Sequence, residues 1–120
     1  MDDRAIISLH ESEAVNAFDC GPAAELRLEA DAALKLAHAF KALSNPIRLQ
    51  ILDILSRGNG QVCVCEIERH FSLTQPTISH HLKILRDAKL ITSEQRGLWV
   101  YHRISSGLID TLHIFLDQLR

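Results

Sequence analysis

From Ala23 to about Ala88, apolar residues recur at spacings of three and four, which is the period of helices that bury one face. The pattern predicts a helix that begins at Ala23, another that begins at Pro46, and a short one between Val62 and Phe71. Asn45 is a preferred helix cap, and proline is tolerated at the first helical position because the N–H that it lacks has no partner there. Gly58-Asn59-Gly60 ends the second helix.

A fourth helix opens with Thr74 as its cap and Pro76 in its first turn. Its apolar stripe consists of Ile78, Leu82, Leu85 and Ala88. At about 100° per residue, this stripe turns Thr77, His80 and Lys83 toward solvent. The fourth helix therefore presents a polar face with short hydrogen-bonding side chains.

After Leu90 the apolar period changes to two, which is typical of strands. Residues 91–96 and 98–104 form two predicted strands joined around Arg96-Gly97, and a last amphipathic helix runs from Gly107 to Leu119. A helix-turn-helix followed by a hairpin is the winged-helix arrangement. We therefore expect a mainly α chain with a β-hairpin, in the α+β class.

Composition places the chain among globular proteins of about one domain. It has 120 residues, of which 47% are hydrophobic and 23% are charged, whereas disordered chains are poorer in apolar residues. We expect residues 1–22 to form an N-terminal arm and residues 23–120 the domain. No stretch approaches the roughly 20 apolar residues of a membrane span, and no secretory signal is recognisable. The three cysteines are a poor disulfide framework, so a reducing, cytoplasmic setting is expected.

The net charge of −2 conceals two segments of opposite sign. Residues 1–31 hold eight acidic and two basic side chains, whereas residues 69–103 hold six basic and two acidic ones. A basic second half indicates a polyanionic partner. No Ser/His/Asp order, phosphate-binding glycine loop or His-Glu-x-x-His set is present, so we do not expect an enzyme.

Three segments resemble one family. They are the opening of the second predicted helix (residues 42–49), the Cys-Val-Cys box (residues 62–67) and the fourth helix with its cap (residues 73–86). Together with the hairpin, the similarity covers roughly residues 32–104 and identifies the chain as a member of the ArsR/SmtB family of metalloregulatory repressors. The resemblance implies a homodimeric winged helix-turn-helix repressor that leaves its double-stranded operator DNA when an inducer binds. It needs no cofactor to bind that DNA.

The fourth helix offers the groups that read DNA. A helix in the major groove needs hydrogen-bonding side chains near its N-terminus, and basic side chains nearby bind phosphates. The candidates for base edges are Gln75, Thr77, Ser79 and His80. The candidates for phosphates or the minor groove are Arg48, Lys83, Arg86, Arg96 and Arg103.

Cys63 and Cys65 form a soft donor pair, which selects trivalent arsenic or antimony, lead, cadmium, bismuth or zinc over hard cations. Both residues are expected at the start of the first helix of the helix-turn-helix, where positions i and i+2 are about 200° apart around the axis. Both sulfurs can therefore hold one ion only if a turn unwinds. That unwinding would disturb the helix-turn-helix. The interpretation is an As(III)- or Sb(III)-responsive repressor of metalloid-resistance genes. A Cd(II), Pb(II) or Zn(II) sensor and a thiol redox or persulfide sensor remain alternatives.

A trivalent ion needs a third ligand besides Cys63 and Cys65. Some family members carry a further cysteine three residues after the second, where this chain has Glu68. Cadmium- and lead-sensing relatives add a pair of N-terminal cysteines from the other subunit, and the resemblance thereby makes Cys20 the third ligand here. Three sulfurs suit pyramidal As(III). In zinc-sensing relatives the last helices bind the ion, and a second site at Asp110, His113 and Asp117 is left open because their spacing departs from that pattern.

Overall fold

The structure is a computed structural model that describes residues 21–58 and 61–120. The described helices are α2 (Ala30–Leu43), α3 (Pro46–Arg57), α4 (Val64–Glu68), α5 (Gln75–Asp87) and α6 (Ser106–Gln118). The described strands are β1 (Val62–Cys63), β2 (Ile91–Arg96) and β3 (Trp99–Ile104). The mainly helical fold with a hairpin is confirmed. None of the helices in the described ranges is long and apolar enough to cross a membrane.

The predicted caps of the two central helices are confirmed. The Asn45 side chain accepts hydrogen bonds from the backbone N–H groups of Ile47 and Arg48, and Pro46 occupies the first turn of α3. Thr74 caps α5 by accepting from the N–H of Thr77. These caps satisfy donors that a helix leaves unpaired at its start, and they set where α3 and α5 begin.

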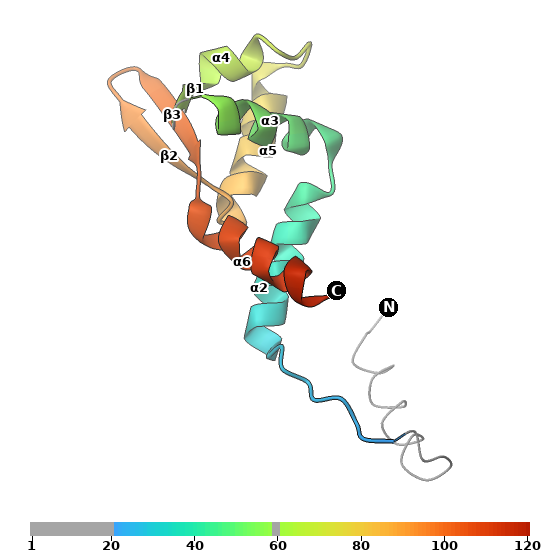
Figure 1. Cartoon of the computed structure of the whole chain (residues 1–120). Helices are drawn as coiled ribbons and strands as arrows, with labels where there is room; N and C mark the ends of the chain where they lie inside the picture. Colours follow the sequence, from blue (N-terminus) through green and yellow to red (C-terminus); the bar gives the residue numbers. More distant parts are fainter. Residues whose placement is uncertain (1–20, 59–60) are drawn as a thin grey trace.

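The predicted start of the first helix at Ala23 is wrong, because α2 begins only at Ala30. Residues 23–28 form no regular element, and Leu26 is 90% exposed. Figure 1 shows this segment leading away from the helices, and of its two leucines only Leu28, next to α2, packs against the core. A short helix without such packing is marginal in water.

The hairpin belongs to a three-stranded antiparallel sheet in the order β1-β3-β2. The sequence pattern predicted β2 and β3 but not β1, which pairs Val62 with His102 and Cys63 with Tyr101. The strands β2 and β3 turn at Gly97-Leu98, where Gly97 has a φ of +62°, a conformation that glycine adopts without strain. The short strand β1 therefore joins the segment that carries the cysteines to the hairpin.

One core holds these elements together, and its fully buried side chains include Ile51 of α3, Ile67 of α4 and Ile78 and Leu85 of α5. Helix α5 packs on α2, α3 and β2. In Figure 1, α3 crosses in front of α5, α4 lies at the N-terminal end of α5, and the hairpin projects to one side. The arrangement leaves one face of α5 and the hairpin pointing outward together.

Candidate nucleic-acid interface and thiol pair

Helix α5 presents its polar side chains as the sequence pattern predicts. Ile78, Leu82 and Leu85 are buried, whereas His80 and Lys83 are exposed. Gln75, Ser79, Lys83 and Arg86 line a groove of about 360 Å³ between α5, α4 and β3. Thr77 is half-buried, and its hydroxyl lies 2.8 Å from that of Thr74, so it is hydrogen-bonded to the N-cap of α5. Four of the predicted base and phosphate contacts thus share the side of α5 that faces the hairpin.

Two basic side chains near this groove, Lys83 and Arg96, form ion pairs with exposed carboxylates. Lys83 Nζ lies 2.8 Å from Asp87 Oδ2, and this hydrogen bond lowers the pKa of Asp87. Arg96 Nη2 lies 3.2 Å from Glu94 Oε2, and its guanidinium sits 5.2 Å from the centre of the Tyr101 ring. Exposed ion pairs contribute only about 0–1 kcal/mol, so a phosphate can replace the carboxylate at little cost. Lys83 and Arg96 therefore remain available to DNA.

The other two arginines of the predicted interface differ in their surroundings. Arg103, on β3, is exposed and donates from Nε to the hydroxyl of Thr92 at 3.4 Å. Arg48 is half-buried: its Nε donates to the carbonyl of Ala42, and its Nη1 lies 3.2 Å from Nδ1 of His81. The guanidinium of Arg48 is thus engaged within the protein.

The two cysteines lie against each other at the junction of the sheet and the helix-turn-helix. Cys63 is buried and ends β1, whereas Cys65 is half-buried in the first turn of α4. The Cys65 thiol lies within hydrogen-bonding distance of Cys63, with the two Sγ atoms 2.8 Å apart. This hydrogen bond, followed by burial, raises the pKa of Cys65. The pair is a preformed two-sulfur donor set.

The expectation that both sulfurs could meet only by unwinding a helix is wrong. Cys63 has φ −69° and ψ 145°, which is extended backbone, and it is the N-cap of α4 without a side-chain capping hydrogen bond. The 200° separation applies only when both residues are helical. Because one residue lies in a strand and the other in a helix, the two side chains converge while both elements are intact.

The structure does not bring the other predicted metal ligands together among the described residues. Cys20 lies outside the described residues. Asp110, His113 and Asp117 are exposed on α6, and Asp117 pairs with Arg120. Among the described residues, no three His, Cys, Asp or Glu side chains gather into a metal-binding group. Glu68, which stands where some relatives have a third cysteine, has a buried carboxylate oxygen for which the structure gives no hydrogen-bond partner.

His102 is a residue that the sequence patterns did not single out. It is 3% exposed, its Nδ1 lies 2.7 Å from the hydroxyl of Ser93, and it pairs across the sheet with Val62. Burial, and then the charge of Arg86, lower the pKa of His102. The signal that could have found it is the alternation along residues 99–104, which gives His102 the same phase as Val100 and Ile104.

Known proteins with similar sequence and structure point the same way. Residues 45–93 match the family model "Bacterial regulatory protein, arsR family". The arsenical resistance operon repressor of Staphylococcus xylosus is 39% identical over 83 residues, which cover 69% of this chain and 78% of the relative. The repressor of the same name from Bacillus subtilis is 41% identical over 78 residues, covering 65% and 73% respectively.

A solved structure extends the match to the fold. It is the homodimeric winged helix-turn-helix DNA-binding domain of a possible ArsR-family transcriptional regulator from Mycobacterium bovis, with 28% identity and a TM-score of 0.61. The match covers 81% of this chain and 92% of that domain. The capped α5, the hairpin beside it and these similarities together lead to one conclusion: the chain belongs to the ArsR family of DNA-binding transcriptional regulators.

Proposed function

We propose that this protein is a homodimeric, cytoplasmic repressor that releases its operator when As(III) or Sb(III) binds Cys63 and Cys65, with Cys20 as a third ligand. The observation that carries the proposal is the 2.8 Å separation of the two Sγ atoms at the start of the helix-turn-helix. Release would derepress metalloid-resistance genes. The names of the Staphylococcus and Bacillus relatives support the arsenical inducer.

The chemistry of the pair supports a soft, trivalent inducer. Thiolate sulfur prefers soft ions to hard cations such as magnesium. Each thiol that binds arsenous acid replaces one As–OH bond with an As–S bond and releases one water, so arsenic stays trivalent and no oxidant is needed. Two cysteines occupy two of the three positions, and the third is left for Cys20, a hydroxide or a small thiol.

The position of the pair supports coupling to DNA. Cys63 pairs with Tyr101 of β3, and the ring of Tyr101 lies beneath the guanidinium of Arg96 on the hairpin. Cys65 lies in α4, the helix that precedes α5. An ion held by both sulfurs joins the sheet to α4. If binding shifts the sheet relative to α4, the positions of the hairpin and of α5 change together. Inducer and operator then compete through two states of one region.

DNA recognition would use α5 in the major groove and the hairpin beside it. Gln75, Ser79 and His80 supply the base contacts, and Thr77 contributes its accessible edge. Lys83, Arg86, Arg96 and Arg103 bind phosphates or the minor groove. Phosphate contacts supply much of the affinity, whereas base edges supply sequence preference.

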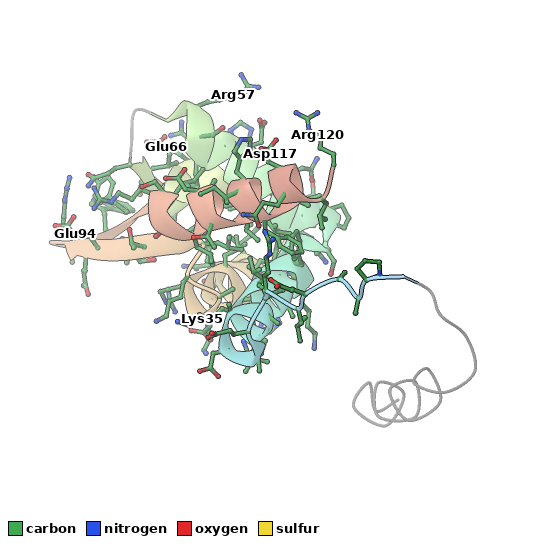
Figure 2. The ribbon with its side chains drawn as sticks, turned by 60° about the horizontal axis from the view of Figure 1, so that its bottom comes forward. Lys35, Arg57, Glu66, Glu94, Asp117 and Arg120 are labelled. Carbon is green, nitrogen blue, oxygen red and sulfur yellow. The ribbon has the colours of Figure 1, made fainter. Side chains whose placement is uncertain are left out.

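A dimer would form through α2 and α6. Leu34 on α2, Ile114 and Leu116 on α6 and Leu119 at the C-cap of α6 are more than half exposed. A cavity of about 700 Å³ is lined by residues of both helices. In Figure 2, α6 lies in front of the other described elements, which leave the side of α6 that faces the viewer uncovered. An apolar face of this kind marks an interaction site, and a second copy buries it symmetrically. The homodimeric Mycobacterium bovis relative supports this assignment.

The deciding experiment titrates the reduced, full-length protein with As(III), Cd(II), Zn(II) and, separately, a persulfide donor in the presence of operator. Ultraviolet sulfur-to-metal absorption reports ligation, and fluorescence anisotropy reports DNA release. The proposal expects As(III) to produce both signals at the lowest concentration. Release by Cd(II) or Zn(II) but not by As(III) would assign the divalent-ion alternative, and release by a persulfide alone would assign the redox alternative.

A further inference from the structure

Arg48 belongs to α3 and contacts both α2 and α5. These contacts lie behind the side of α5 that is proposed to face DNA. Its backbone belongs to the first turn of α3, its Nε donates to the carbonyl of Ala42 in the last turn of α2, and its Nη1 lies 3.2 Å from His81 Nδ1 on α5. The Ala42 carbonyl is one of the last four of α2, which a helix leaves without an internal partner. A cation at that end also complements the helix dipole.

The contact between Arg48 and His81 determines the protonation state of the histidine. A guanidinium carries only donors, so the His81 Nδ1 must accept, and the ring is then neutral with its proton on Nε2. A doubly protonated ring would set two donors and two positive charges against each other. Burial, and then the charges of Arg48 and His80, lower the pKa of His81, which agrees with a neutral ring.

We propose that Arg48 and His81 form a positioning pair that fixes the orientation of α5 on α2 and α3, and that Arg48 serves this pair instead of a DNA phosphate. His81 lies on the flank of α5 opposite the groove lined by Gln75, Ser79 and Arg86, as 100° per residue requires. A rotation of α5 about its axis breaks the contact and displaces every base-reading side chain together. The inference rests on the proposed operator binding.

The groups around the pair set the direction of its pH dependence. Arg48 faces His81 from α3, and His80 is its neighbour on α5. His38 and Lys41 of α2 and Asp87 of α5 line a cavity of about 320 Å³ beside Arg48. Asp87 is already paired with Lys83, and the partner of His81 is the Arg48 cation, so protonation of His81 adds a like charge and opens the contact. Operator affinity is therefore expected to fall as pH drops below the ordinary histidine range near 6.5.

The experiment uses the full-length protein and two probes: a duplex that the wild-type protein selects from a randomised library, and an unselected duplex of equal length. Arg48→Ala is expected to weaken binding to the selected duplex about tenfold, with little change on the unselected one and an unchanged salt slope. If Arg48 instead binds a phosphate, both duplexes weaken equally and the slope falls by about one. That result overturns the inference.

Two histidine variants test the other half of the pair. His81→Asn places an amide oxygen where Nδ1 lies, so it is expected to keep the affinity at neutral pH and to remove the loss in acid. His81→Ala is expected to match Arg48→Ala, and the double variant is expected to lose no more than either single one. The exposed control His70→Asn is expected to keep the acid loss. Additive losses, or an acid loss that persists in His81→Asn, would overturn the pairing.

A measurement without DNA tests the Arg48–His81 pair separately from the proposed operator binding. The ¹⁵N shift of His81 Nδ1 is expected to report an unprotonated acceptor at neutral pH and to change in Arg48→Ala. If no duplex is selected at all, operator binding fails, and the shift still tests the pair. If a duplex is selected but the shift does not respond to Arg48→Ala, the positioning pair fails while operator binding stands.

Discussion

The Sγ atoms of Cys63 and Cys65 lie 2.8 Å apart even though the two residues belong to different elements. Cys63 closes a strand paired with the hairpin, and Cys65 opens the first helix of the helix-turn-helix. A ligand that binds both sulfurs therefore touches the two parts that are proposed to contact DNA. No helix has to unwind before such a ligand can bind.

Cysteine substitutions test this junction. Cys65→Ser is expected to leave a folded protein that still binds operator, because the uninduced state needs no ligand there, but it should no longer be released by As(III). Cys20→Ser should keep part of the response, with inducer affinity about tenfold weaker, or about 1.4 kcal/mol. Anisotropy of labelled operator during As(III) titration measures both. A full response in Cys65→Ser would contradict the two-sulfur site, whereas an unaltered Cys20→Ser would remove only the third ligand.

Base recognition by α5 is tested by His80→Ala and Gln75→Ala. Each should weaken operator binding by about 1–3 kcal/mol, because a lost base contact leaves the base edge without its partner. Binding to random DNA should change little. Competition assays with the two kinds of duplex measure the difference, and an equal loss on both would mean that these side chains do not read bases.

The hairpin is tested through the salt dependence of binding. Arg96→Ala should lower the slope of log affinity against log salt by about one, because one phosphate contact releases about one counterion. Arg120→Ala is the matched control, since both arginines pair with an exposed carboxylate. Figure 2 shows Arg120 at the far side of the molecule from Glu94, the hairpin partner of Arg96. A slope that Arg96→Ala leaves unchanged would place the hairpin away from DNA.

Self-association through α6 is tested by Leu119→Glu, which places a charge on a side chain that is 67% exposed in the single chain. If a second copy covers it, the dimer should weaken at least about tenfold, because an unpaired charge is costly to bury. Leu98→Glu, at a hairpin position that is 92% exposed, is the control and should leave the dimer intact. Sedimentation equilibrium measures both, and an unchanged dimer in Leu119→Glu would exclude this face.

His102 makes folding stability depend on pH. Its pKa is lowered in the folded state, mainly by burial, so below the ordinary value of 6.5 the unfolded chain binds a proton that the folded chain does not. The contribution is complete above pH 6.5 and is lost as pH falls further. Urea midpoints measured across this range should decline in the wild type and decline less in His102→Asn. The exposed His70→Asn should behave like the wild type.

The sequence by itself determined the elements whose signals are local. Asn45 with Pro46, and Thr74 with Pro76, mark the starts of α3 and α5 through hydrogen bonds that span only two or three residues. The apolar period then identifies the buried face of α5, and so its polar face. The change to a period of two identifies the hairpin. These signals depend on neighbours along the chain, and they were sufficient to predict a winged helix-turn-helix.

Only the tertiary structure decided what depends on residues distant in sequence. The two residues of β1 are extended because β3 supplies hydrogen-bond partners about 40 residues later, and that pairing brings Cys63 to Cys65. Arg48 looks like a phosphate ligand in the sequence, yet His81, 33 residues away, and the end of α2 engage it. Pairing across a sheet and contacts between helices follow from packing, for which periodicity along one segment carries no signal.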